Sequence, residues 1–158
     1  MKIFDCFMYF DEEIVLDIRL NMLNPVVDYF VIVESKFTHK GDKRNLKFDI
    51  NKFTEFKDKI IYLIFDEEPR DIESLLDKDI EDEKTRKLIL NAARRENSQR
   101  NFIMKGLENA NNDDLILISD VDEIPNLEEI NFKNIKNQII LFKQDMFYYK
   151  LNLKLPDL

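Results

Sequence analysis

Short apolar runs alternate along this chain with segments of helical periodicity. The strand-like runs are residues 2–10, 28–35, 59–65 and 115–119. The helical patterns cover residues 11–24, 51–57 and 84–110. The run at residues 28–35 lacks polar alternation, which is typical of a strand covered on both faces. Strands that alternate with helices predict right-handed crossovers, and therefore an open α/β fold whose twisted, mainly parallel sheet carries helices on both faces.

Periodicity also suggests which helix faces are buried. In the first helix, Val15, Ile18 and Met22 fall at helical spacing. In the last helix the stripe consists of Leu88, Ala92, Phe102, Ile103 and Gly106. Arg95 and Gln99 interrupt that stripe, where an unpaired cation would be costly. We therefore expect Arg95 to form either an internal ion pair with an acid near a neighbouring strand end, or a phosphate contact.

Other segments are predicted to connect these elements or to follow them. Residues 36–44 form a polar loop, and residues 66–83 form an acidic connection that is either plain surface or disorder, or a loop gated by substrate. Near the end, residues 126–130 suggest a short helix. The aromatic-rich residues 138–152 suggest a final strand or pair of strands.

Composition narrows the class of protein. The 158 residues predict one domain over residues 1–158, and the net charge of -8 argues against nucleic acid as the main partner. No run is long enough to span a membrane, and the two glycines rule out a Gly-rich nucleotide fingerprint. The lone cysteine, Cys6, is expected to be buried and inert. Because the N-terminus also lacks the features of a signal peptide, we expect a cytoplasmic protein.

The stretch "LILISDVDEIPN" places carboxylates directly after a buried-looking strand. Residues two apart on a strand share a face, so Asp120 and Asp122 are expected side by side at the edge where α/β sheets bind ligands. Such oxygen ligands suit Mg²⁺ or Mn²⁺, which share their coordination with substrate phosphates. The alternative is a solvated acidic turn. A calcium-binding loop of the EF-hand kind is excluded. Counted from Asp120, the sixth position, which requires glycine, holds Pro125, and the twelfth position, which requires glutamate, holds Asn131.

Three further side chains are candidates for the site. "RRENSQRN" includes Arg100 in the helix that precedes the carboxylates, where it could contact phosphate. Glu34 ends a core strand on the presumed ligand side, and it could contact a base or ribose or merely cap the strand. His39 lies in the polar loop and is expected to be solvated rather than catalytic.

The chain resembles glycosyltransferase family 17, the family of the β-1,4-mannosyl-glycoprotein β-1,4-N-acetylglucosaminyltransferase. The likeness lies in "FDEEIVLDIRLNMLNPVVDYFVIVESKFTHKGDKRNLKF", "QRNFIMKGL" and "DDLILISDVDEIP". It implies a GT-A-like fold, a UDP-N-acetylglucosamine donor, and transfer to a glycan acceptor with inversion at the anomeric carbon. Carried over by motif, Asp120, Asp122 and Glu123 form the metal-binding segment. Glu34, Arg100 and Asp120 are then predicted to bind the donor, with Asp120 and Asp122 on the metal.

This chain differs from the family in the extent of its C-terminal part. The family domain continues past its equivalent of "YYKLN" into segments that in GT-A enzymes carry the acceptor site and usually the catalytic base. We therefore expect this chain to be the nucleotide-binding half, and we assign no catalytic residue. A non-catalytic nucleotide-sugar-binding or interaction module, or one half of a two-chain enzyme, stays an alternative. The apolar residues of 138–158 predict a homo-oligomer.

Overall fold

The computed structural model describes residues 1–128, 130–132, 139–147 and 153–155. Its internal contacts divide the chain into two units, Met1–Asp122 and Glu123–Leu158, and each unit is described by itself. All named helices and strands belong to the first unit. The assignment of residues 1–158 to one domain stays a prediction.

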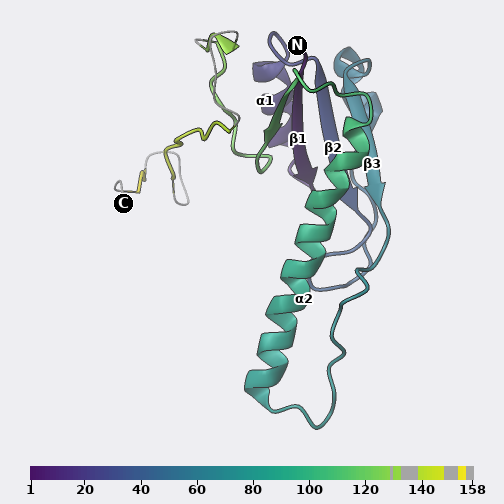
Figure 1. The fold of residues 1–158 in the computed structure, drawn as a ribbon. Coiled ribbons are helices and arrows are strands. Elements are labelled where there is room, and N and C mark those ends of the chain that lie inside the picture. Colours follow the sequence, from purple (N-terminus) through teal and green to yellow (C-terminus); the bar gives the residue numbers. More distant parts are fainter. Residues whose placement is uncertain (129, 133–138, 148–152, 156–158) are drawn as a thin grey trace. The chain divides into compact units, whose positions relative to one another are not determined.

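A parallel sheet forms the centre of the first unit. Its strands are β1 (Ile3–Tyr9), β2 (Tyr29–Ser35), β3 (Ile60–Phe65) and β4 (Leu115–Ile118). They lie in the order β3-β2-β1-β4, and each neighbouring pair is parallel (Figure 1). The chain moves outward from β1 to β3 and then returns to the other side of β1. The direction of winding therefore reverses between β1 and β4, where ligands bind in folds of this kind.

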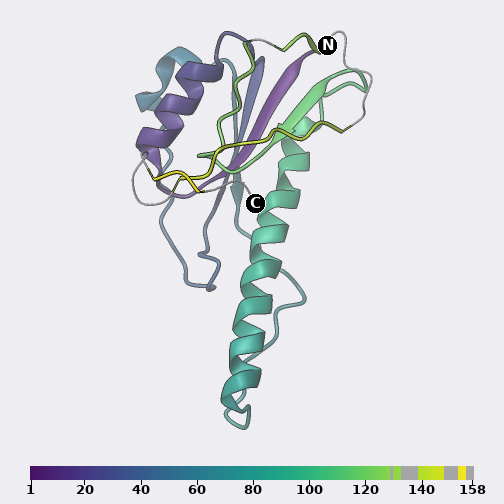
Figure 2. The same ribbon diagram turned by 90° about the vertical axis from the view of Figure 1, so that its left-hand side faces the viewer.

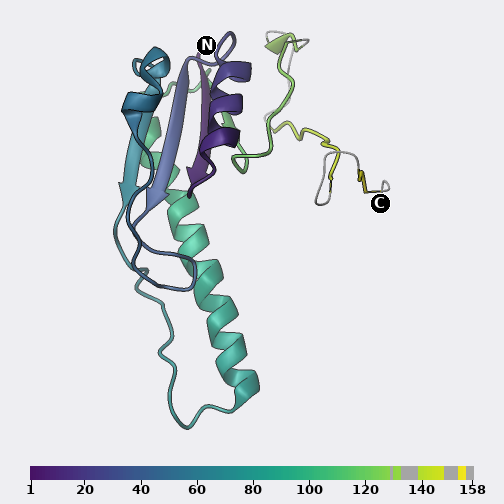
Figure 3. The ribbon, with the colours of Figure 1, turned by 180° about the vertical axis from the view of Figure 1, so that it is seen from behind.

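Helices cover both faces of the sheet, as predicted. The helices are α1 (Glu13–Leu23) and α2 (Glu81–Asn101), with 3₁₀ turns η1 (Ile50–Lys52), η2 (Thr54–Phe56) and η3 (Phe102–Leu107). Helix α1 lies on one face, while the end of α2 and η3 lie on the other (Figures 1 and 3). The short helix expected over residues 51–57 is therefore present as two 3₁₀ turns, and α2 begins earlier than the predicted residue 84.

The core beneath η3 explains the position of Gly106 and the character of Cys6. Its buried members are Phe4, Cys6, Val31, Val33, Phe65 and Ile103. A Cβ atom on Gly106 would lie 2.4 Å from Val31 Cγ1, so only glycine lets η3 approach β2 this closely. Cys6 is fully buried, and burial raises the pKa of its thiol. The predicted burial of Cys6 is therefore confirmed, and its lack of reactivity stays a prediction.

The buried face of α1 differs from the predicted one. Ile18 and Met22 are exposed, and the buried residues of the helix are Leu16, Arg19, Leu20 and Leu23. Apolar residues occur all round this helix, so their spacing alone admits more than one buried face. The structure buries the face that carries Arg19, whose partner Asp5 lies on β1.

Helix α2 extends well beyond the sheet (Figure 2). The predicted apolar stripe is therefore wrong in its first half, where Leu88 is exposed. The acidic connection leads away from the sheet alongside this part of α2 and is tied to it by ion pairs. These pairs are Arg94 with Asp71 at 3.1 Å, Arg94 with Glu73 at 3.0 Å, and Lys87 with Asp79 at 2.6 Å. The connection thus has defined partners, and its gating by substrate stays a prediction.

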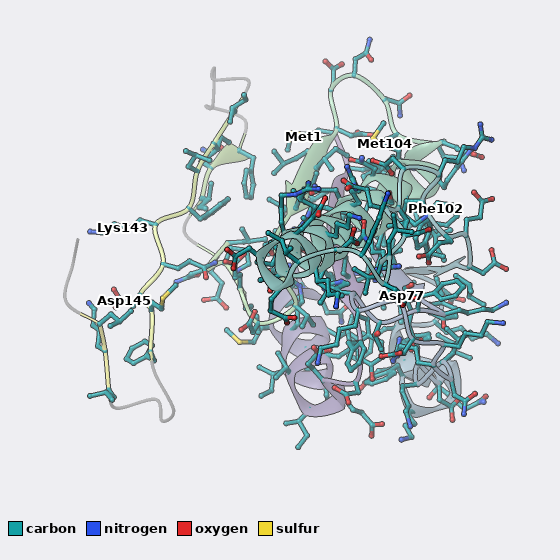
Figure 4. The ribbon with its side chains drawn as sticks, turned by 90° about the horizontal axis from the view of Figure 1, so that it is seen from below. Met1, Asp77, Phe102, Met104, Lys143 and Asp145 are labelled. Atoms are coloured by element: carbon teal, nitrogen blue, oxygen red, sulfur yellow. The ribbon has the colours of Figure 1, made fainter. Side chains whose placement is uncertain are left out.

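The second unit contributes little regular structure among its described residues. An isolated bridge joins Phe147 to Lys154, and Lys154 forms a 2.7 Å ion pair with Asp145, which Figure 4 labels. The helix expected over 126–130 is not formed at 126–128, and residue 129 lies outside the described residues. The strands expected over 138–152 also fall partly outside them. In the part of the chain that the structure describes, no helix is both long and apolar enough to cross a membrane.

Candidate functional site

A cleft of about 900 Å³ opens at the carboxyl ends of β1 and β2, beside the segment that follows β4. This volume is ample for a small-molecule ligand, and the position is the one that the switch in winding predicts. Five segments line the cleft: the end of β1, the start of α1, the end of β2 with the loop after it, the last turns of α2, and residues 120–122. The titratable residues lining it are Tyr9, Glu12, His39, Lys40, Asp42, Arg44, Glu96, Arg100, Asp120 and Asp122.

Both predicted aspartates line this cleft, although strand alternation does not place them there. Strand β4 ends at Ile118, so Asp120 and Asp122 lie in the turn that follows. Arg100 joins them from α2, because its Nη2 atom lies 3.0 Å from Asp120 Oδ1 and 3.2 Å from Glu96 Oε1. Burial works against the charge of Arg100, but the hydrogen bonds to Asp120 and Glu96 outweigh it and raise the pKa of the guanidinium.

A buried ion pair lies under the turn that carries the two aspartates. Arg19 donates from Nε and Nη2 to the two carboxylate oxygens of Asp5, at 2.8 and 2.7 Å, and both side chains are fully buried. Its remaining donors reach the chain beyond β4. Nη1 donates to the carbonyls of Asp120 and Val121 at 2.7 and 3.1 Å, and Nη2 donates to Ser119 Oγ at 2.7 Å. Arg19 therefore connects α1, β1 and the turn.

Glu34 lies inside the protein and is not among the residues lining the cleft. Its carboxylate accepts hydrogen bonds from the backbone amides of Lys47 and Phe48, at 2.7 and 3.1 Å, and from the Tyr62 hydroxyl at 2.7 Å. It also pairs with Arg44 at 3.0 Å. Burial and the hydrogen bond to Glu34 raise the pKa of Tyr62. The structure thus gives Glu34 internal partners, and its contact with a base or ribose stays a prediction.

Arg95 holds the loop over residues 36–44 against α2. Its Nε donates to Glu68 Oε1 at 2.8 Å, and its Nη1 donates to the His39 carbonyl at 3.2 Å. Gly41, at φ +100°, packs against the same guanidinium, because a Cβ there would lie 2.6 Å from Arg95 Nη2. Of the two alternatives for Arg95, the structure shows the internal ion pair. His39 lines the cleft, and its lack of a catalytic role stays a prediction.

Arg44 fixes the other end of this loop and orders an aromatic wall of the cleft. Its guanidinium lies 4.1 Å from the centre of the Phe10 ring, and its Nη1 donates to the Ser35 carbonyl at 2.8 Å. Phe10 is 44% exposed and lines the cleft directly after β1. A partly exposed ring whose orientation is held by a cation offers a flat surface for stacking.

Comparisons with known proteins identify the family. The sequence profile of glycosyltransferase family 17 matches residues 1–152. The chain belongs to glycosyltransferase family 17. The human and rat proteins named beta-1,4-mannosyl-glycoprotein 4-beta-N-acetylglucosaminyltransferase are each 31% identical to it over 121 residues, which cover 74% of this chain and 20% of theirs. This chain thus spans about a fifth of the length of these curated relatives. No solved structure matches it.

The divalent cation implied by the resemblance to family 17 can be tested against the side chains present. Within the described residues, no three or more His, Cys, Asp or Glu side chains come together as a metal-binding group. Asp120 and Asp122 therefore do not form a complete protein cage. Mg²⁺ and Mn²⁺ commonly use one or two carboxylates together with substrate phosphates, so the pair fits a cation bound jointly with a diphosphate. Glu123 begins the second unit, and its predicted role stays a prediction.

Sequence reasoning missed Arg19 and its partner Asp5, although a signal was present. "IFDCF" places an acid within an apolar strand, and "DIRLN" places a base between two apolar residues of a helix. Buried charges are rare unless they are paired, so two opposite charges in core elements that follow each other along the chain indicate a buried ion pair. The contact of Arg19 with the turn after β4, about a hundred residues later, has no comparable signal.

Proposed function

We propose that this chain is the donor-binding part of a metal-dependent, inverting glycosyltransferase, and that the sugar it transfers from a UDP-sugar to a glycan acceptor is N-acetylglucosamine. The observation that carries the proposal is the meeting of Asp120, Asp122 and Arg100 in one cleft at the switch in winding of the sheet. Membership of family 17 and the printed names of the relatives support the reaction class and the sugar.

Different cleft residues would bind different parts of a nucleoside diphosphate and its cation. Asp122, which is exposed, and Asp120 would supply oxygen ligands to Mn²⁺ or Mg²⁺. Such a cation neutralises charge that develops on the departing nucleoside diphosphate. Arg100 would contact the diphosphate directly, because guanidinium groups bind phosphate oxygens in a fork geometry. Phe10, stacked on Arg44, would contact the base or the ribose.

The acceptor and the catalytic base stay unassigned. Because the chain spans about a fifth of its curated relatives, the activity of the whole protein and its glycan acceptor are proposals. The competing class is a nucleotide-sugar-binding module without turnover. Hydrolysis of UDP-N-acetylglucosamine by the purified chain would exclude that module. The cytoplasmic location stays a prediction, and recovery of the expressed protein in a membrane or secreted fraction would contradict it.

Calorimetric titration with UDP, with and without Mn²⁺, tests the proposed donor site. We expect Mn²⁺ to strengthen UDP binding to the wild-type chain, and we expect Asp122→Ala to abolish that gain. Asp113→Ala is the matched control, because it removes one exposed carboxylate from the turn before β4 and Asp113 does not line the cleft. Equal binding by Asp122→Ala and the wild type would refute the proposal, as would a wild-type chain that binds no UDP.

A further inference from the structure

The Asp5–Arg19 ion pair of the first unit carries a large desolvation cost. Both side chains are fully buried between α1 and β1, and the Arg19 guanidinium also lies 4.6 Å from the centre of the Phe7 ring. Removing two charges from water costs about as much as their attraction returns, and apolar residues of similar size often stabilise a fold as well or better. Stability alone therefore does not account for the pair.

The other contacts of Arg19 point to what the pair does. After its two bonds to Asp5, the guanidinium donates to three successive residues: Ser119 through its hydroxyl, and Asp120 and Val121 through their carbonyls. These residues form the turn between β4 and Asp122. The guanidinium thus holds the main chain of residues 120 and 121 and the side chain of Ser119, in the segment that carries the two cleft carboxylates.

The sheet gives this turn little support. Among the residues that the structure describes, β4 lies at the edge of the sheet; it ends at Ile118, and the Ser119 amide lies a long 3.4 Å from the Cys6 carbonyl. Arg19 supplies donors directly beyond that point. Asp5, opposite Leu117 in the sheet register, aims the guanidinium toward the turn, because bidentate pairing fixes both the position and the plane of the fork.

We propose that Asp5 and Arg19 are positioning residues for the cation–diphosphate site, acting on Asp120 and Asp122 through the Ser119 hydroxyl and the main chain of residues 120 and 121. This inference rests on the proposed function, because it assumes that the two carboxylates bind a cation together with UDP. Both side chains are fully buried and neither lines the cleft, so we expect neither to touch the ligand. Their effect should therefore appear in the part of UDP binding that depends on the metal, since displacing ligating groups by about 1 Å can cost about 100-fold in function.

The double variant Asp5→Leu/Arg19→Met tests the proposal, because it replaces the buried charges by apolar groups and preserves the core. We expect thermal unfolding near the wild-type temperature, a loss of about 10- to 100-fold in the Mn²⁺-dependent part of UDP affinity, and little change in metal-free UDP binding. Hydrogen exchange of the amides of residues 119–122 should become faster, while exchange in β1 and β2 stays slow.

A second buried pair provides the matched control. Asp79 and Lys87 form a 2.6 Å ion pair that is also shielded from solvent, but it ties the acidic connection to α2 and neither residue lines the cleft. Asp79→Leu/Lys87→Met should leave unchanged both the Mn²⁺-dependent gain in UDP affinity and the hydrogen exchange of the amides of residues 119–122. An equal loss in this control would overturn the proposal, because the effect would then be general.

Two milder variants keep the test decisive if the double variant does not fold. Ser119→Ala removes a single acceptor of Arg19, and Arg19→Lys keeps the charge opposite Asp5 but loses the fork that reaches the turn. Both should reduce the metal-dependent gain, Arg19→Lys more strongly. The proposal would be overturned if these variants showed the same Mn²⁺-dependent gain in UDP affinity as the wild type and the same hydrogen exchange at residues 119–122.

The outcomes distinguish this inference from the proposed function. If the wild type gains affinity with Mn²⁺ and Asp122→Ala loses the gain, the donor site stands, and the Asp5 and Arg19 variants then decide the positioning role alone. If the wild type shows no metal-dependent binding, the proposed function fails and the positioning role fails with it. Faster exchange at residues 119–122 would in that case mark the pair as purely structural.

Discussion

Replacing Arg100 by alanine separates ligand binding from folding. Arg100 forms ion pairs with Asp120, whose side chain is 54% exposed, and with Glu96, whose side chain is 43% exposed. Exposed pairs contribute about 0–1 kcal/mol, so the free energy of unfolding without ligand should change by less than about 1 kcal/mol. If Arg100 binds the diphosphate, loss of a hydrogen bond to a charged group should weaken UDP binding by about 1.5–3 kcal/mol, or about 10- to 150-fold in Kd.

Arg95 on the same helix should show the opposite behaviour. Its side chain is 12% exposed, and it bonds to Glu68 and to the His39 carbonyl. Arg95→Ala removes a mostly buried guanidinium that packs against Gly41 and holds the loop against α2, which should cost about 0.5–3 kcal/mol, and each kcal/mol lowers Tm by about 2–4 °C in a chain of this size. Its direct effect on UDP contacts should be small.

Thermal unfolding without ligand and calorimetric titration with UDP, run on both variants, check this contrast. Arg70→Ala is the charge-matched control, because Arg70 is exposed in the acidic connection and does not line the cleft. The reasoning would be refuted if Arg100→Ala lowered Tm without weakening UDP binding, or if Arg95→Ala weakened UDP binding at unchanged Tm.

Two further predictions concern alkaline stability and assembly. Burial, with a smaller contribution from Glu34, raises the pKa of Tyr9 from 10.0 to about 12. The unfolded chain then loses its tyrosine proton first, so denaturant unfolding should show stability falling as the pH rises through this range, and Tyr9→Phe should reduce the slope. The apolar side chains of Ile139, Leu141, Met146 and Leu153 are exposed, which favours self-association. Light scattering after size exclusion should report a homo-oligomer, and a monomer of 19.0 kDa at micromolar concentration would contradict this.

Local patterns were sufficient for the strands and the two long helices of the first unit, and for part of the lining of the cleft. Unbroken apolar runs predict buried parallel strands, and carboxylates placed after such a run must lie at the carboxyl edge of the sheet. Asp120 and Asp122 could therefore be assigned to the ligand edge from sequence. Arg100 was assigned with them because it lies on the helix that leads into the same strand. These predictions depend only on order along the chain and on the geometry of α/β crossovers.

By itself, then, the sequence determined the α/β class, the family, and the edge of the sheet at which the cleft opens. Only the tertiary structure decided which face of α1 is buried, because apolar residues surround that helix and several faces would satisfy its periodicity. It also decided the partners of Arg19 and Glu34. A buried charge is stable only where donors and acceptors from distant segments surround it, and here those segments meet only when the chain folds.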